Sequence, residues 1–274
     1  MSFTPTDQGP RPDEARHQHL ATMDPTPCED PGAGAKARHW QALSFDLDGT
    51  LVDTAAEIAE ATNRALEEHG ITRRPEAEIT LLIGAGAHAL MRRLLQRVAD
   101  EGAPGSPGIP VEAVMRSLDR HYAATAGLSA RPYPGCLDAL TMLRVAGIRL
   151  ACVTNKELRF AERVLEETGL RGCFELVVGG DSLPEKKPHP SVLKHVAAHF
   201  ACNCSALAHV GDSAVDVDAA RQAGVAAWAV PYGYNAGVPI VEARPERIFD
   251  DLGAVARYVL EPTADHHPAG TGRP

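Results

Sequence analysis

The most informative segment of the chain reads Ala42-Leu-Ser-Phe-Asp-Leu-Asp-Gly-Thr-Leu-Val-Asp-Thr54. Its first half carries an apolar residue at every second position from Leu43 to Leu47, which is the pattern of a half-buried strand. The pattern breaks at Gly49, and a helical pattern begins near Ala55. The segment therefore predicts a strand, a turn and a helix, the first unit of an α/β fold.

Two acidic residues, Asp46 and Asp48, stand two positions apart at the carboxyl end of this strand. Because side chains on a strand alternate between faces, we expect both carboxylates on one face, with α-carbons about 6.5 Å apart. Open parallel sheets bind their ligands at the carboxyl ends of the strands. Two like charges this close repel each other, so the pair requires a cation or a shared proton.

Composition narrows the classes of function. Of the 274 residues, 23% are charged and 5% aromatic, and the formal net charge is −9. This balance argues against nucleic acid or a membrane surface as a partner. There is no apolar run of about 18 residues and no apolar signal core, so we expect a cytoplasmic protein. Six cysteines without a framework spacing are expected to be free thiols.

The pattern along the chain predicts its organisation. Residues 1–38 contain almost no large aliphatic side chains and residues 262–274 contain none, so we expect a disordered extension and a flexible tail. From Pro132 onwards strands and helices alternate, which predicts a parallel sheet covered on both faces. The expected strands are Ile148–Val153, Phe174–Val178, Leu207–Val210 and Ala226–Val230.

Residues 55–131 show helical patterns only, which predicts an inserted small domain between two parts of the core, residues 39–54 and 132–261. The expected helices are Ala55–His69, Glu76–Ile83, Ala87–Asp100 and Val111–Ala126.

Polar residues follow the later strands as well. They are Thr154 and Asn155, the Lys186-Lys187-Pro188 loop, Asp212, and Asp216 four residues further on. Clustered carboxylate oxygens suit Mg²⁺, which is bound by protein carboxylates together with substrate phosphate. A lysine and a threonine suit the phosphate itself.

In order and spacing, these residues resemble the four motifs of the haloacid dehalogenase-like superfamily, over about residues 42–250. Within this superfamily the chain is most similar to bacterial phosphoglycolate phosphatases. Those proteins share short motifs that resemble Ile83-Gly-Ala-Gly86, Gly179–Pro188 and Tyr232–Asn235. The resemblance implies an α/β fold, a three-layer, Rossmann-like parallel-sheet core with an inserted helical cap domain, and a Mg²⁺-dependent phosphatase.

The resemblance also implies roles for single residues. Asp46 is the expected nucleophile, which forms an aspartyl-phosphate, and Asp48 the general acid and base. An alkoxide leaving group needs a proton and a halide does not, so Asp48 favours a phosphatase over a dehalogenase. Lys187, directly before proline, is chosen over Lys186 as the catalytic lysine.

The remaining implied site residues bind the phosphoryl group, the metal and the substrate. The phosphoryl group is expected on Gly49, Thr154, Asn155 and Lys187. The magnesium ligands are expected to be Asp46, the backbone carbonyl of Asp48 and Asp212, with Asp216 orienting a metal-bound water or Lys187. Expected substrate contacts from the cap are Gly84, Gly86 and Arg93.

Several functions remain open. A phosphatase of 2-phosphoglycolate is the first hypothesis, and a phosphatase of a sugar phosphate such as N-acetylmuramic acid 6-phosphate or a β-phosphoglucomutase-like enzyme is the alternative. A phosphonate hydrolase needs a cap lysine, and residues 55–128 contain none. A non-catalytic phosphate-binding module is disfavoured because every chemical position holds a competent residue. We expect a monomer or a homodimer whose partner is a small phosphorylated metabolite.

Overall fold

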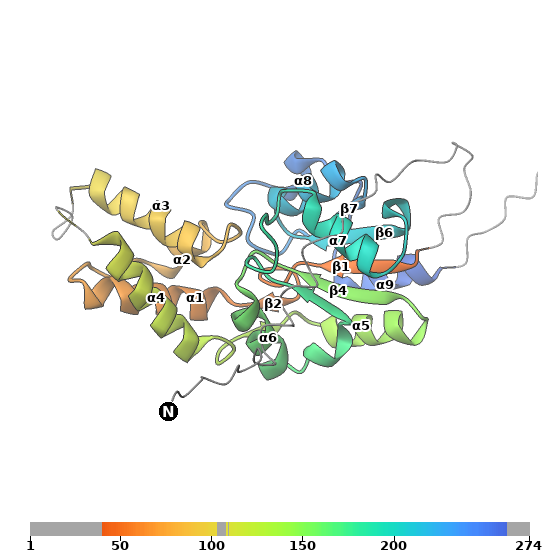
Figure 1. Cartoon of the computed structure of the whole chain (residues 1–274), viewed down its shortest axis with the longest axis horizontal. Helices are drawn as coiled ribbons and strands as arrows, with labels where there is room; N and C mark the ends of the chain where they lie inside the picture. The colour runs from red at the N-terminus through yellow and green to blue at the C-terminus, as the bar shows by residue number, and fades with distance from the viewer. Residues whose placement is uncertain (1–39, 103–107, 109, 262–274) are drawn as a thin grey trace, which may run out of the picture. The chain divides into compact units, whose positions relative to one another are not determined.

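A six-stranded parallel sheet in the order β5-β4-β1-β6-β7-β8 forms the centre of the chain in a computed structural model (Figure 1). The structure describes residues 40–102, 108 and 110–261, so the extension and tail predicted over 1–38 and 262–274 lie outside the described residues. The strands are β1 (Ala42–Phe45), β4 (Arg149–Val153), β5 (Leu176–Val178), β6 (Leu207–Gly211), β7 (Ala226–Ala229) and β8 (Arg247–Ile248).

The first strand is central and is buried on both faces. All four residues of β1 are buried, including Ser44, so the prediction of a half-buried strand was wrong. Leu43 and Phe45 belong to the apolar core on one side of the sheet, and Ala42 belongs to the core on the other. In the sequence, the polar Ser44 stands where a solvent-facing residue of a half-buried strand is expected. In the structure its hydroxyl lies 2.9 Å from Nδ1 of the buried His209.

Helices cover both faces of the sheet. On one face, α5 (Cys136–Val145), α6 (Leu158–Glu167) and α9 (Leu252–Leu260) share an apolar core with the strands. On the other face, α7 (Ser191–His199) and α8 (Ala214–Ala223) do the same (Figure 1). The predicted three-layer parallel-sheet core is therefore confirmed.

Four helices are inserted between β1 and α5: α1 (Ala55–Glu68), α2 (Glu76–Thr80), α3 (Ala87–Asp100) and α4 (Val111–Thr125), called here the helical insertion. They bury an apolar cluster of their own, to which the core adds Phe160. The second helix ends three residues before the predicted Ile83, because a turn carries the chain towards Gly84. Among the described residues, no helix is both long and apolar enough to cross a membrane.

Two short strands join the helical insertion to the core. In β2 (Val52–Asp53) and β3 (Arg131–Pro132), Val52 pairs with Pro132 and Asp53 with Arg131 in an antiparallel arrangement. The sequence pattern does not reveal these strands, because two residues are too few to show a period of two. The same applies to β8 at the edge of the main sheet.

Candidate active site

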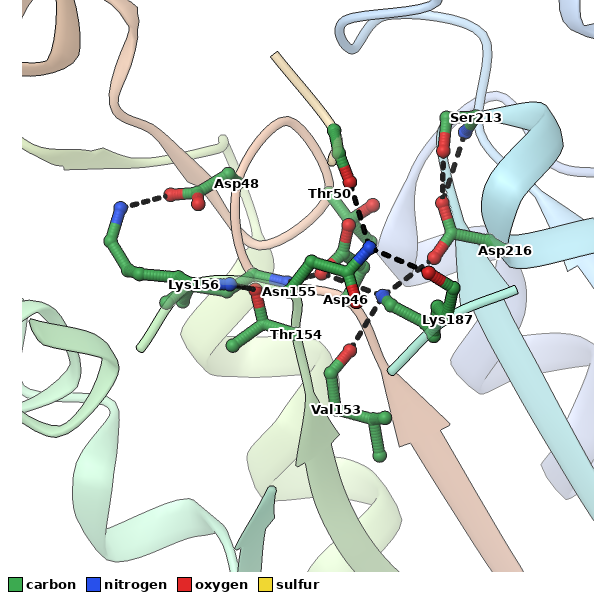
Figure 2. Close-up of polar contacts among 12 residues, drawn as sticks. Asp46, Asp48, Thr50, Val153, Thr154, Asn155, Lys156, Lys187, Ser213 and Asp216 are labelled. Atoms are coloured by element: carbon green, nitrogen blue, oxygen red, sulfur yellow. Dashed lines mark hydrogen bonds and ion pairs between the residues drawn. The ribbon is translucent and has the colours of Figure 1, made fainter. Parts of the chain in front are cut away.

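The candidate site lies at the carboxyl ends of the three neighbouring strands β4, β1 and β6. Asp46 follows β1, Thr154 follows β4, and Asp212 follows β6. The backbone N–H of Asp46 still donates to Val210 O at 2.9 Å, so the residue is fixed against β6. Lys187 reaches the same place from the loop before α7 (Figure 2).

Lys187 lies between two carboxylates. Its Nζ is 2.9 Å from Oδ1 of Asp46 and 2.7 Å from Oδ1 of Asp216, and it also donates to Val153 O at 2.6 Å. Burial alone would lower the pKa of Lys187, but Asp216 and Asp46 outweigh burial and raise it. The buried ammonium is therefore charged and fixed beside the expected nucleophile, with Asp216 as its second counter-ion.

Asp216 is held from two sides in the first turn of α8. Its Oδ2 accepts from the backbone N–H and the hydroxyl of Ser213, at 3.2 and 2.6 Å. Its Oδ1 faces Lys187 and, at 3.2 Å, Nε2 of His209. Burial would raise the pKa of Asp216, but Lys187 and His209 outweigh burial and lower it. Because both of its oxygens are held in this way, Asp216 fixes the position of the Lys187 ammonium.

Asp212 lies on the other side of Asp46. Its Oδ1 accepts from the Thr50 hydroxyl at 2.9 Å, and its Oδ2 accepts from the backbone N–H of Tyr234. Gly49 has φ +86°, and a Cβ there would lie 2.4 Å from Oδ2 of Asp212. Only glycine allows this approach, which holds the Asp212 carboxylate next to the loop after β1.

The donor set fits a hard divalent cation. Asp46, Asp212 and Asp216 are all buried, and each offers a carboxylate oxygen within 4.8 Å of the others, against the single ammonium of Lys187. Burial, and after it the charge of Asp216, raises the pKa of Asp212. Burial also raises the pKa of Asp46 to about 7, because it outweighs the opposing effect of Lys187. Carboxylates that lack positive charge are suited to a hard divalent cation, which Asp46 and Asp212 could hold.

The two acids of the opening segment have different partners. Because β1 ends at Phe45, strand alternation does not place Asp48 beside Asp46, and the expectation of a same-face pair does not follow. Oδ1 of Asp48 instead accepts from Thr54 Oγ1 and from Lys156 Nζ, each at 2.7 Å (Figure 2). Among the described residues, Oδ2 of Asp46 accepts no hydrogen bond, which leaves this oxygen available for chemistry.

Lys156 is a buried cation that the sequence analysis missed. Its ammonium lies 4.9 Å from the centre of the Tyr122 ring, which comes from α4 of the helical insertion. Burial would lower the pKa of Lys156, but Asp48, Tyr122 and Glu57 outweigh it and raise it. Its position directly after Thr154 and Asn155 was the available signal, since it shares their loop.

The expected phosphoryl-binding residues gather around Asp46. Thr154 is buried, with its N–H bonded to Val178 O at 2.9 Å. Asn155 Nδ2 donates to Lys187 O at 2.9 Å and to Gly84 O at 3.0 Å, so it links the lysine loop to the helical insertion.

One pocket opens over these residues. It is lined by Asp46, Asp48, Ile58, Ile83, Gly84, Gly86, Ala87, Leu90, Tyr122, Thr154, Asn155 and Lys156. Gly86 lies close to the core, because a Cβ there would be 2.8 Å from Asn155 O. Arg93 is exposed and does not line the pocket, so the structure does not bring it to the other expected substrate contacts.

Tyr234 is a second residue that the sequence analysis left without a role, although the Tyr232–Asn235 segment was noted. Its hydroxyl accepts from the N–H groups of Thr54 and Ala55, at 2.7 and 2.9 Å, and donates to Asp53. Its backbone N–H binds Asp212. Tyr234 therefore connects the expected metal ligand to the start of the helical insertion.

The arrangement of a strand-end aspartate, a buried lysine and two further aspartates has a counterpart in known proteins. The family model described as haloacid dehalogenase-like hydrolase matches residues 43–230. The chain belongs to this family. The resemblance inferred from the motifs is therefore confirmed.

Relatives of this haloacid dehalogenase-like hydrolase carry a common name. The phosphoglycolate phosphatase of Nitrosospira multiformis is 41% identical over 219 residues, covering 80% of this chain and 95% of that protein. The phosphoglycolate phosphatase of Vibrio cholerae is 35% identical over 218 residues, covering 80% and 96%. A crystal structure of a predicted phosphoglycolate phosphatase from Haemophilus somnus matches with 31% identity and a TM-score of 0.77, covering 82% and 99%. The chain is thus a phosphoglycolate phosphatase-like hydrolase of phosphoric monoesters.

Proposed function

We propose that this hydrolase is a Mg²⁺-dependent phosphatase that converts 2-phosphoglycolate to glycolate and phosphate. The main support is that Asp46 and Asp48 line one pocket with different partners. Asp46 is next to the cation of Lys187 and has one oxygen without a hydrogen bond from the described residues. Asp48 lies at the side of Lys156 and Tyr122, where the organic part of a substrate would extend.

In the proposed reaction, Oδ2 of Asp46 attacks phosphorus and the bond to the ester oxygen breaks. Protonated Asp48 gives this oxygen its proton, so that glycolate leaves and an aspartyl-phosphate remains. A water then attacks phosphorus, Asp48 takes its proton, and the bond to Asp46 breaks to release phosphate. When bound, Mg²⁺ supplies positive charge that lets the anionic nucleophile approach an anionic phosphate.

The helical insertion is proposed to be the cap that covers the substrate. Its contribution to the pocket consists of Ile58, Ile83, Gly84, Gly86, Ala87, Leu90 and Tyr122. These residues include no charged or carboxamide side chain. A sugar phosphate needs several polar partners for its hydroxyl groups, so this lining favours a small substrate over the sugar phosphatase and mutase alternatives.

Phosphate release with Mg²⁺ should be compared as kcat/KM across 2-phosphoglycolate, sugar phosphates and nucleotides. We expect 2-phosphoglycolate to be preferred, and Asp46→Asn to lower its turnover by at least about 10³-fold while the protein remains folded. Near-normal turnover by the folded Asp46→Asn variant would rule out this nucleophile, and a preference for a sugar phosphate would rule out the substrate.

The role of Asp48 is tested separately. Asp48→Ala should slow alkyl phosphates more than aryl phosphates, because a phenolate leaves with less need of a proton. Equal losses on both classes would contradict the general-acid assignment.

A further inference from the structure

The pocket has a cation on the side of the organic group. Lys156 is 3% exposed, comes from the loop after β4, and is the only lysine or arginine among the lining residues. Figure 2 shows the two buried lysines on separate carboxylates, Lys187 on Asp46 and Asp216, and Lys156 on Asp48. The phosphoryl group has Lys187 as its neighbour, so Lys156 is available for another anion.

Lys156 pairs with one carboxylate at the wall of the pocket. The distance from Lys156 Nζ to Oδ1 of Asp48 is 2.7 Å. A buried ammonium is stabilised by each further anion within reach, so Lys156 favours an anionic substrate group in the pocket that it lines.

The nearby Glu57 does not supply such an anion by itself. It is buried, its Oε2 accepts the N–H of Gly127 at 2.8 Å, and its Oε1 has no hydrogen-bond partner. No ion pair joins Glu57 to Lys156 in the described part of the chain. An ammonium has three donors, and Asp48 and Tyr122 take at most two of them, so Lys156 retains the capacity to bind a substrate group.

We infer that Lys156 binds the carboxylate of the substrate and thereby selects phosphorylated hydroxy acids over neutral phosphomonoesters; this inference rests on the proposed function. In 2-phosphoglycolate one methylene group separates the ester oxygen from the carboxylate. The groups that contact these two parts of the substrate must therefore be neighbours. Asp48 and Lys156 are such neighbours, and Lys156 reaches its position below Tyr122 of the helical insertion.

The test uses a matched pair of substrates, 2-phosphoglycolate and its neutral amide, 2-phosphoglycolamide. The wild-type enzyme should prefer the acid in kcat/KM by about 10- to 100-fold, the value of a charged hydrogen bond. Lys156→Gln keeps a donor for Asp48 but removes the charge, and the preference should fall to about 1- to 3-fold. A Lys194→Met variant, which alters an exposed lysine on α7, should keep the wild-type preference.

Several results would overturn the inference. One is an equal loss on both substrates, which would mean that Lys156 acts only through Asp48. Another is an Arg93→Met variant that loses the preference while Lys156→Gln keeps it. If the wild-type enzyme itself does not prefer the acid over the amide, the inference is overturned without any variant.

The proposed function can fail independently. If the enzyme hydrolyses a different phosphorylated hydroxy acid, the proposed substrate is wrong, and that acid and its amide test Lys156 in the same way.

Discussion

The ammonium nitrogen of Lys187 lies 2.9 Å from Oδ1 of Asp46, and both side chains are buried. The same nitrogen lies 2.7 Å from Asp216, which is itself held by Ser213 and His209. One cation thus balances two carboxylates, and a fixed chain of contacts runs from α8 to the expected nucleophile.

Replacing Lys187 should damage both catalysis and stability. In Lys187→Met, Asp46 and Asp216 lose their shared cation in a buried place. We expect a loss of about 3–5 kcal/mol in the free energy of unfolding near pH 8, since one partner of a buried ion pair is removed. Turnover of the remaining folded protein should fall at least about 10³-fold. Urea unfolding and phosphate release measure the two effects.

The neighbouring lysine provides the control for stability. Lys186 is exposed, and within the described part of the chain its Nζ donates to Ala85 O alone. Lys186→Met should change the free energy of unfolding by no more than about 0.5 kcal/mol. Similar losses of stability in the two variants would contradict the role given to the buried pair.

Gly49 should not tolerate even a methyl group. In Gly49→Ala the new Cβ would lie 2.4 Å from Oδ2 of Asp212 at a φ of +86°. Because Asp212 or the loop must move, we expect phosphatase activity to fall about 100-fold and stability by about 2–4 kcal/mol. Activity at saturating Mg²⁺ and thermal unfolding are the measurements.

Substitution of Gly70 is the control that introduces the backbone strain without the clash. It has φ +72°, and a Cβ there would meet nothing within 4 Å. Gly70→Ala should therefore cost only the left-handed backbone, about 1 kcal/mol, with normal activity. If both alanine variants remain active, close contact with Asp212 is not important for the site.

Glu57 should make stability depend on pH. Burial, which outweighs Lys156, raises the pKa of Glu57 from 4.5 to about 7. A raised carboxyl pKa means that the folded state binds the proton more tightly, so stability is fully retained below pH 4.5 and falls as pH rises towards 7. The ionised group then costs at most about 3 kcal/mol.

Glu57→Gln removes this titration and keeps an oxygen for the N–H of Gly127. Urea unfolding should show that the variant is more stable than the wild type at about pH 8, and that the difference disappears near pH 4.5. Glu67→Gln, an exposed change on the same helix, should not show this pattern. A difference that stays constant with pH would exclude Glu57 as the source.

The sequence was sufficient to predict those site residues that directly follow a strand. Asp46, Thr154 and Asp212 each follow a strand whose apolar pattern is clear, and adjacent parallel strands bring their ends together. Helical spacing also predicts the position of Arg93. Leu90, Leu94 and Val98 are buried at helical spacing, which places Arg93 on the solvent side of α3.

Contacts between segments that are distant in the sequence could not be predicted from the periodic patterns. The role of Lys156 depends on Asp48 and Tyr122, which lie on other elements and share no periodic pattern with it. The same is true of Tyr234, whose hydroxyl joins the N–H groups of Thr54 and Ala55. These relationships arise only when the insertion and core are folded together.

The pairing of β2 with β3 places the exit and the return of the chain side by side, with Val52 opposite Pro132 and Asp53 opposite Arg131. The strands that Asp46, Thr154 and Asp212 follow pair with one another in the main sheet, and this pairing involves no residue of the intervening helices. Recombination at these two points would exchange the helical insertion as a module. Lys156 lies in the core and Tyr122 in the helical insertion, so a recombinant would keep the buried ammonium and take its aromatic neighbour, with most of the pocket lining, from the donor.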